Sequence, residues 1–217
     1  MSVETDDFKG HIHIIGRNLT DLTVDSLYSH VYTYGNVSYA WIYSDANIFH
    51  NMISKSTAAA SVPAAYKEWA ASASGRVTLD NVTDKSVSGM VTVSNAGSVR
   101  DSSFLARQRV TISVAKEGSL SGVVADTTVA TSGKWETSES NYNVSITAED
   151  IVNTTVLSEN GNATAKGQQS VMVTAKDTIS GSSFKTDNDM KVTAGGIIMA
   201  SNFEGESIDA SVVSDSL

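Results

Sequence analysis

The 217-residue sequence contains no cysteine and a single proline, Pro63. Without cysteine the chain can form neither a disulfide framework nor a thiolate metal site. With one proline, its turns depend on Gly, Asn and Asp, which suit tight connections between strands. Charged residues make up only 18% of the chain, below the roughly 25% of an ordinary soluble domain. Ser and Thr fill that deficit, at about a quarter of all residues.

Basic residues are also few relative to acidic ones, and the formal net charge is −9. Such a surface repels phosphate backbones, so we expect no nucleic-acid partner. No apolar run approaches the roughly 20 residues of a membrane span. The first seven residues are acidic and lack the apolar core of a signal peptide. We expect a virion protein, a cytoplasmic protein, or an exported protein whose signal was removed.

The sequence does contain a recurrence of large apolar residues every five or six positions. A helix would show a period of 3.6 and a simple hairpin strand a period of two. A step of five or six is typical of β-solenoids, in which each short strand sends a bulky residue inward before a corner. The recurring residues are Ile14, Leu19, Val24, Val31, Val37, Ile42, Ile48 and Ile53, then Val82, Val87, Val93, Val99, Phe104 and Val110, and finally Val173, Ile179, Phe184, Met190, Ile197, Phe203, Ile208 and Val213.

A longer repeat gives the length of one coil. Short Val-Thr or Val-Ala segments begin nineteen residues apart at Val91, Val110 and Val129, and again at Val173 and Val192. The pattern predicts an all-β parallel β-solenoid with about 18–19 residues per coil, and with insertions between Val129 and Val173. We expect Val93, Val110, Val173 and Val192 in its core. The alternative is an antiparallel β-sandwich.

Four segments follow from these patterns. Residues 1–9 form a polar tail, 10–55 a first β portion, and 76–217 the main solenoid. Residues 56–75 are rich in alanine, with Pro63 placed near the start and Gly75 at the end of a predicted short helix or linker.

Aromatic residues crowd into the first β portion. Tyr39, Trp41 and Tyr43 alternate with inward positions, so we expect them in a row on an outer face, near Tyr32 and Tyr34. Such rings can fill a subunit interface or stack on sugars. They can also pack beneath the predicted helix.

No catalytic residue, metal site or cofactor is predicted. The four histidines (His11, His13, His30 and His50) are expected in solvent or at corners, although some hexapeptide β-helices use one histidine as a catalytic base. The motifs of hydrolases, zinc proteases and nucleotide-binding enzymes are missing from the sequence.

Glycosylation sequons are somewhat more frequent than chance predicts and favour an exported surface. They lie at Asn18, Asn36, Asn81, Asn143, Asn153 and Asn162.

These observations predict a non-enzymatic structural subunit that assembles with itself. The apolar steps Phe203, Ile208 and Val213 suggest a final coil whose edge can pair with another subunit. We expect an extracellular or virion structure such as a sheath, coat, surface layer or fibre.

Two alternatives stay open. The segment Val31-Tyr-Thr-Tyr-Gly-Asn-Val37 resembles the Gly-Asn-Val corners of bactofilins, which implies a cytoplasmic filament. The aromatic face would instead suit a carbohydrate-binding or sugar-modifying β-helix protein.

Overall fold

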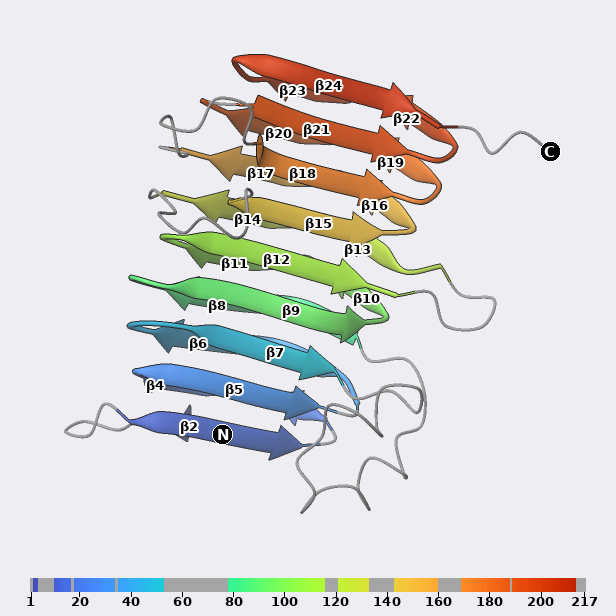
Figure 1. Cartoon of the computed structure of the whole chain (residues 1–217). Helices are drawn as coiled ribbons and strands as arrows, with labels where there is room; N and C mark the ends of the chain where they lie inside the picture. The colour runs from blue at the N-terminus through green and yellow to red at the C-terminus, as the bar shows by residue number, and fades with distance from the viewer. Residues whose placement is uncertain are drawn as a thin grey trace.

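The computed structural model is a parallel β-solenoid (Figure 1). It describes residues 2–3, 10–16, 18–33, 35–52, 78–115, 121–132, 143–159, 169–187 and 189–213. Every strand pairing in these ranges is parallel, with successive coils stacked along one axis. The predicted solenoid is therefore confirmed, and the antiparallel sandwich is wrong.

One side of the solenoid is a sheet of nine strands, one from each coil. In stacking order they are β2 (His11–Gly16), β5 (Tyr28–Thr33), β7 (Ile48–Met52), β9 (Met90–Ala96), β12 (Arg109–Val114), β15 (Val144–Ala148), β18 (Gln169–Ala175), β21 (Asp189–Ala194) and β24 (Ser207–Val212).

The other side is a fifteen-stranded sheet bent into two arms. The first arm holds β3 (Leu19–Thr20), β10 (Ser98–Arg100), β13 (Val123–Ala125), β16 (Asp150–Val152), β19 (Thr178–Ser180) and β22 (Ile197–Met199). The second arm holds β1 (Ser2–Val3), β4 (Thr23–Ser26), β11 (Ser103–Ala106), β14 (Thr128–Thr131), β17 (Thr155–Ser158), β20 (Ser183–Thr186) and β23 (Asn202–Glu204). Two longer strands, β6 (Val37–Ser44) and β8 (Thr78–Ser86), run through both arms.

The strand register fixes the coil length. Leu19 pairs with Val37, eighteen residues later, and Val173 pairs with Val192, nineteen residues later. Four coils are longer: the first-arm partner comes 42 residues after Val37, 25 after Val99, 27 after Val124 and 28 after Ile151. The extra residues fall at corners, so the pairing resumes in register after each one.

The expected nineteen-residue repeat at Val129 is wrong. Val110 pairs with Val91 as expected, but its partner in the following coil is Val144. Val129 belongs to the second arm, where it pairs with Phe104 and Val156. An insertion at residues 133–142 separates the two positions, as the blurred pattern in that region indicated.

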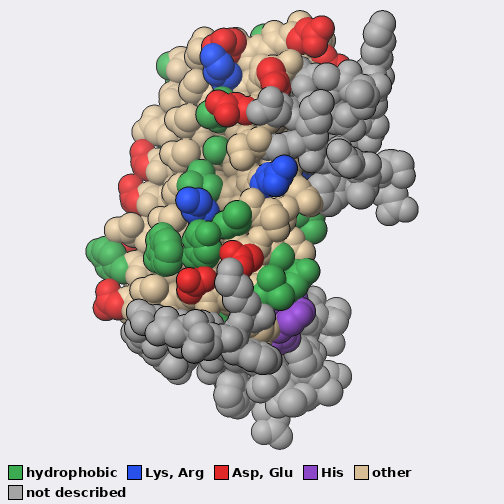
Figure 2. Space-filling model, turned by 90° about the vertical axis from the view of Figure 1, so that its left-hand side faces the viewer, with side chains coloured by type: hydrophobic (Ala, Val, Ile, Leu, Met, Phe, Trp, Pro, Cys, Tyr) green, Lys and Arg blue, Asp and Glu red, His purple; other side chains and the backbone are tan. Residues whose placement is uncertain are grey.

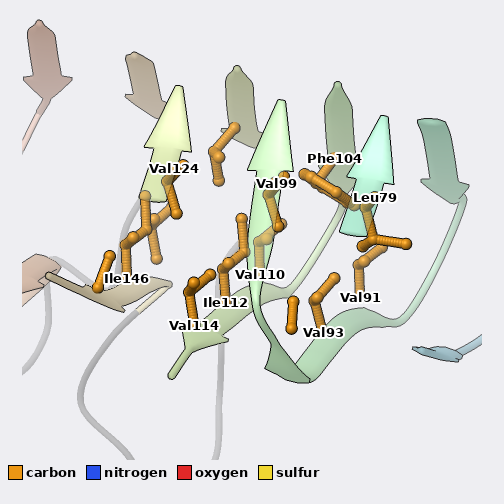
Figure 3. Close-up of a cluster of buried hydrophobic side chains, with 14 of the residues drawn as sticks. Leu79, Val91, Val93, Val99, Phe104, Val110, Ile112, Val114, Val124 and Ile146 are labelled. Atoms are coloured by element: carbon orange, nitrogen blue, oxygen red, sulfur yellow. The ribbon is translucent and has the colours of Figure 1, made fainter. Parts of the chain in front are cut away.

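Apolar side chains from both sheets meet along the axis and form one continuous core. We use the word column for residues that occupy the same position in successive coils. In Figure 3 the side chains of Val99 and Phe104 from the bent sheet, and of Val110 and Ile112 from the flat one, lie in the space between the two sheets. Val93, Val110, Val173 and Val192 are all fully buried, as predicted. A single coil cannot cover its own apolar residues. In a parallel stack they are buried against the equivalent residues of the neighbouring coils.

The two arms of the bent sheet meet at a corner where one residue per coil has a left-handed backbone. These residues form a column of Asp21, Tyr39, Asn81, Asp101, Asp126, Asn153, Gly181 and Ala200, with φ between 47° and 58°. Asn, Asp and Gly tolerate this conformation better than other residues. Beside the column runs a second one of buried hydroxyls. Ser102 Oγ, for example, donates to the Arg100 carbonyl and accepts from the Val82 amide.

The first β portion and the main solenoid form one continuous stack. β6 pairs with β8 in one sheet, and β7 pairs with β9 in the other. The predicted helix at 56–75 lies outside the described residues, as do most residues of the 1–9 segment. Within the described ranges no helix is long and apolar enough to cross a membrane.

Candidate functional sites

In the last coil, the residues at positions that are buried in other coils are exposed to solvent. Inward residues of β21 and β24 share columns, since Met190 pairs with Ile208, and Val192 with Ala210. The β21 members are buried, whereas 43% of Ile208 and 49% of Val212 are exposed. In the described part of the chain, β24 pairs on one side only. This coil is therefore an open edge with an uncovered apolar face.

The three residues predicted for the assembly edge all lie on this coil or beside it. Ile208 and Val213 are exposed. Phe203 is partly buried, because its ring stacks on Phe184 with the centroids 5.3 Å apart. Ile197 and Met199 add exposed apolar surface in the same coil.

As far as the described residues extend, the first coil is open in a similar way. β2 is the other end of the nine-stranded path. Its inward residues Ile12 and Ile14 are only partly buried, while Val31, the next residue in the Ile14 column, is fully buried.

The predicted aromatic face divides into separate places. Trp41 and Tyr43 do share the outer face of the second arm, where their rings stack with centroids 5.8 Å apart. Tyr39 is exposed at the left-handed corner, so the bend removes it from that row. Tyr32 lies on the flat sheet, and Tyr34 is outside the described residues.

A groove of about 390 Å³ begins beside Tyr43 and crosses the outer face of the second arm. Ala130 lies in one column between Leu105 and Leu157, and its small side chain leaves a hollow between theirs. Lys85, Arg107 and Glu159 also line the groove, which gives its apolar floor a charged rim with two basic groups and one acidic group. Figure 2 shows hydrophobic side chains gathered on this face with basic groups among them.

Two histidines, His13 and His30, stack with Phe49 on the outside of the flat sheet, and His11 stacks separately on Tyr28. The rings of His13 and His30 are 4.9 Å apart, and His30 lies 4.7 Å from Phe49. Burial, followed by the charges of His13 and His11, lowers the pKa of His30. The folded state therefore disfavours protonation there, and it loses stability as the pH falls below about 6.5.

The fourth histidine lies in the core, so its predicted place in solvent or at a corner is wrong. His50 alternates with the outward Phe49 on β7 and occupies the column between Val31 and Val93. Its Nδ1 lies 3.0 Å from Oδ2 of Asp84, which takes a core position on β8, and both side chains are 0% exposed. None of their polar side-chain atoms makes a hydrogen bond, and the two side chains form an ion pair when His50 is protonated.

Alternation could have found both members of this buried pair. Ile48 and Val82 are inward residues, and two positions further along each strand stand His50 and Asp84. The search for apolar recurrence passed over them because they are polar. Since the pair is sealed in the core, it can contact no substrate in the folded solenoid.

Among the described residues no three His, Asp or Glu side chains converge as metal ligands would.

The predicted glycosylation sites differ in how exposed they are. Asn18, Asn36, Asn81 and Asn153 are exposed, and Asn162 lies outside the described ranges. Asn143 is buried, and its Nδ2 donates to the Gln108 carbonyl at 3.0 Å. A glycan at Asn143 would require this bond to break.

No protein-family model matches the chain, and comparisons with curated proteins and with solved structures gave no significant match.

Proposed function

We propose that this protein is a non-enzymatic structural subunit that associates end to end with copies of itself. The observation that carries the proposal is the last coil, where the columns of Met190 and Ala194 end in the exposed Ile208 and Val212. An open strand edge with an apolar face is a template for further pairing. A second copy suits it, since the first coil of the chain offers the same columns.

The structure to which such a subunit belongs would be extracellular or part of a virion: a sheath, coat, surface layer or fibre. The abundance of Ser and Thr and the four exposed sequons support this location. A cytoplasmic filament of the bactofilin kind would use the same end-to-end contact. Expression in the native host followed by fractionation separates the two locations.

Charge substitution at the open edge tests the association. Ile208→Lys with Val212→Lys should abolish it, because two ammonium groups would have to be buried in the contact. Val87→Lys is the matched control, since Val87 is likewise 43% exposed but lies on a side corner. Sedimentation velocity of the three proteins at low and moderate salt is the measurement.

Added salt should promote assembly of the wild-type chain by screening its −9 charge. A wild-type protein that stays monomeric at high concentration and at every salt level would contradict the proposal. Equal association of the Ile208/Val212 variant and the wild type would contradict the placement of the contact.

The groove beside Tyr43 favours a second candidate function, carbohydrate binding. Trp41 and Tyr43 present two nearly parallel rings, and Lys85 Nζ lies 6.0 Å from the Tyr43 centroid. Flat rings next to a groove with charged and apolar side chains suit a polysaccharide. Affinity electrophoresis in gels containing neutral or acidic polysaccharides would show retardation. Trp41→Ala should abolish it, and Tyr39→Ala, an exposed aromatic at the other corner, should not.

A further inference from the structure

Resting on the proposed self-association, we infer that copies join head to tail: β24 of one copy pairs in parallel with β2 of the next, and Asp209 lies beside His13 of that copy. Both strands are the free ends of the same sheet, as the described residues define it. A parallel contact here repeats the pairing that joins every neighbouring pair of coils inside the molecule.

Apolar columns would continue across this junction. The column that begins at Ile14 and Val31 runs through His50, Val93, Ile112, Ile146 and Val173 to Val192 and Ala210, and both of its ends are apolar. In a head-to-tail contact Ala210 therefore meets Ile14 of the next copy. Ile208 meets Ile12 in the same way. Side chains that are exposed or half-buried at the two ends would cover one another.

Charges on the outside favour the same orientation. His13 starts one outward column with His30 stacked on it, and Lys191 and Asp209 end that column with their charged groups 3.6 Å apart. Joined head to tail, the Asp209 carboxylate comes one coil spacing, about 4.8 Å, from the imidazole of His13. The carboxylate would then lie between two basic groups, Lys191 of its own chain and His13 of the next.

The symmetric alternatives lack this complementarity. A tail-to-tail contact brings the acidic last coils together, each with Glu204, Glu206 and Asp209. A head-to-head contact brings His11 and His13 against their own copies. Because a head-to-tail contact uses two different surfaces, it does not close at a dimer and extends into a filament.

The absence of native cysteine makes disulfide mapping of the contact direct. Adjacent strands bring paired Cα atoms within the 4.4–6.8 Å that a disulfide spans. His13→Cys and Asp209→Cys each change an exposed residue. Mixed and mildly oxidised, the two variants should give a dimer linked between positions 13 and 209 as the dominant species, identified by mass spectrometry of the joined peptides. The double variant should give a ladder of covalent oligomers.

Control variants set the background. Val87→Cys mixed with His13→Cys should give only trace dimer, because position 87 lies on the side of the solenoid. If the 209–209 dimer dominates instead, the head-to-tail inference is overturned while end-to-end association stands. If sedimentation finds the wild-type chain monomeric under all conditions and no specific disulfide forms, both proposals fail.

Discussion

The residues at the left-handed corner differ from coil to coil in how well they tolerate a positive φ. Asn, Asp or Gly occupies six of the eight positions, and Tyr39 and Ala200 are the exceptions. A left-handed backbone costs an ordinary L-residue about 1–2 kcal/mol. Two coils therefore hold backbone strain that the others avoid.

Tyr39→Asn should consequently stabilise the protein, by about 1 kcal/mol. The Tyr39 ring is mostly exposed, so little packing is lost, and Asn81 in the next coil shows that the position accepts an amide. Tyr39→Ala is the control, because it removes the ring but keeps a residue with a side chain in the left-handed region. Chemical denaturation midpoints should rise for Asn and stay level or fall for Ala. A lower midpoint for Asn would mean that the ring itself contributes to stability.

Strands β7 and β8 carry the one buried ion pair that the described residues contain. Its neighbours in the same columns are apolar: Val31 and Val93 flank His50, and Ile42 and Phe104 flank Asp84. Burying two charges costs desolvation energy that their attraction recovers only in part. We therefore expect the pair to contribute little to net stability.

A double-mutant cycle separates these effects. His50→Val alone should lower the free energy of unfolding by about 3–5 kcal/mol, because it leaves the Asp84 carboxylate buried without a partner. Asp84→Ile alone should also destabilise. The double variant should be as stable as the wild type or more so, since it restores two apolar columns. Additive losses in the double variant would show that the two side chains act independently.

The strand elements were predictable from the sequence where apolar residues alone mark the inward positions. This held for Val93, Val110, Val173 and Val192, each of which is fully buried. It failed at Val129, because a corner insertion changed the coil length without changing the pattern inside the strand. It also failed at Tyr39, because the pattern of apolar residues does not show where the backbone takes a left-handed conformation. His50 was missed because a polar residue in an inward column has no apolar signature.

At the scale of the whole molecule, each coil contacts only its neighbours above and below, as Figure 1 shows. Stability in such a stack is close to a sum of coil and neighbour terms. A coil should therefore be removable if the cut preserves every column.

Deletion of residues 178–196 provides the test. It removes one nineteen-residue coil and places Ile197 where Thr178 stood, in accordance with the native pairing of these two residues. The shortened chain should fold, with a β-rich circular dichroism spectrum and a lower unfolding midpoint. Deletion of 173–190 is one residue shorter and joins two strands midway, so that Lys191 takes the inward place of Val173 and the rest of that strand turns its inward residues outward. It should yield insoluble protein. Equal behaviour of the two deletions would contradict the fixed register.

Corner insertions have a further consequence for how this protein can change. Coils of 18 and of 28 residues stack in the same columns, so a residue's place is given by its coil and its column, and its number along the chain matters little. Length can therefore vary at a corner while the interior stays the same. The corners that precede β15 and β18 are in consecutive coils, and two foreign peptides spliced there would be displayed side by side at a spacing set by the backbone itself.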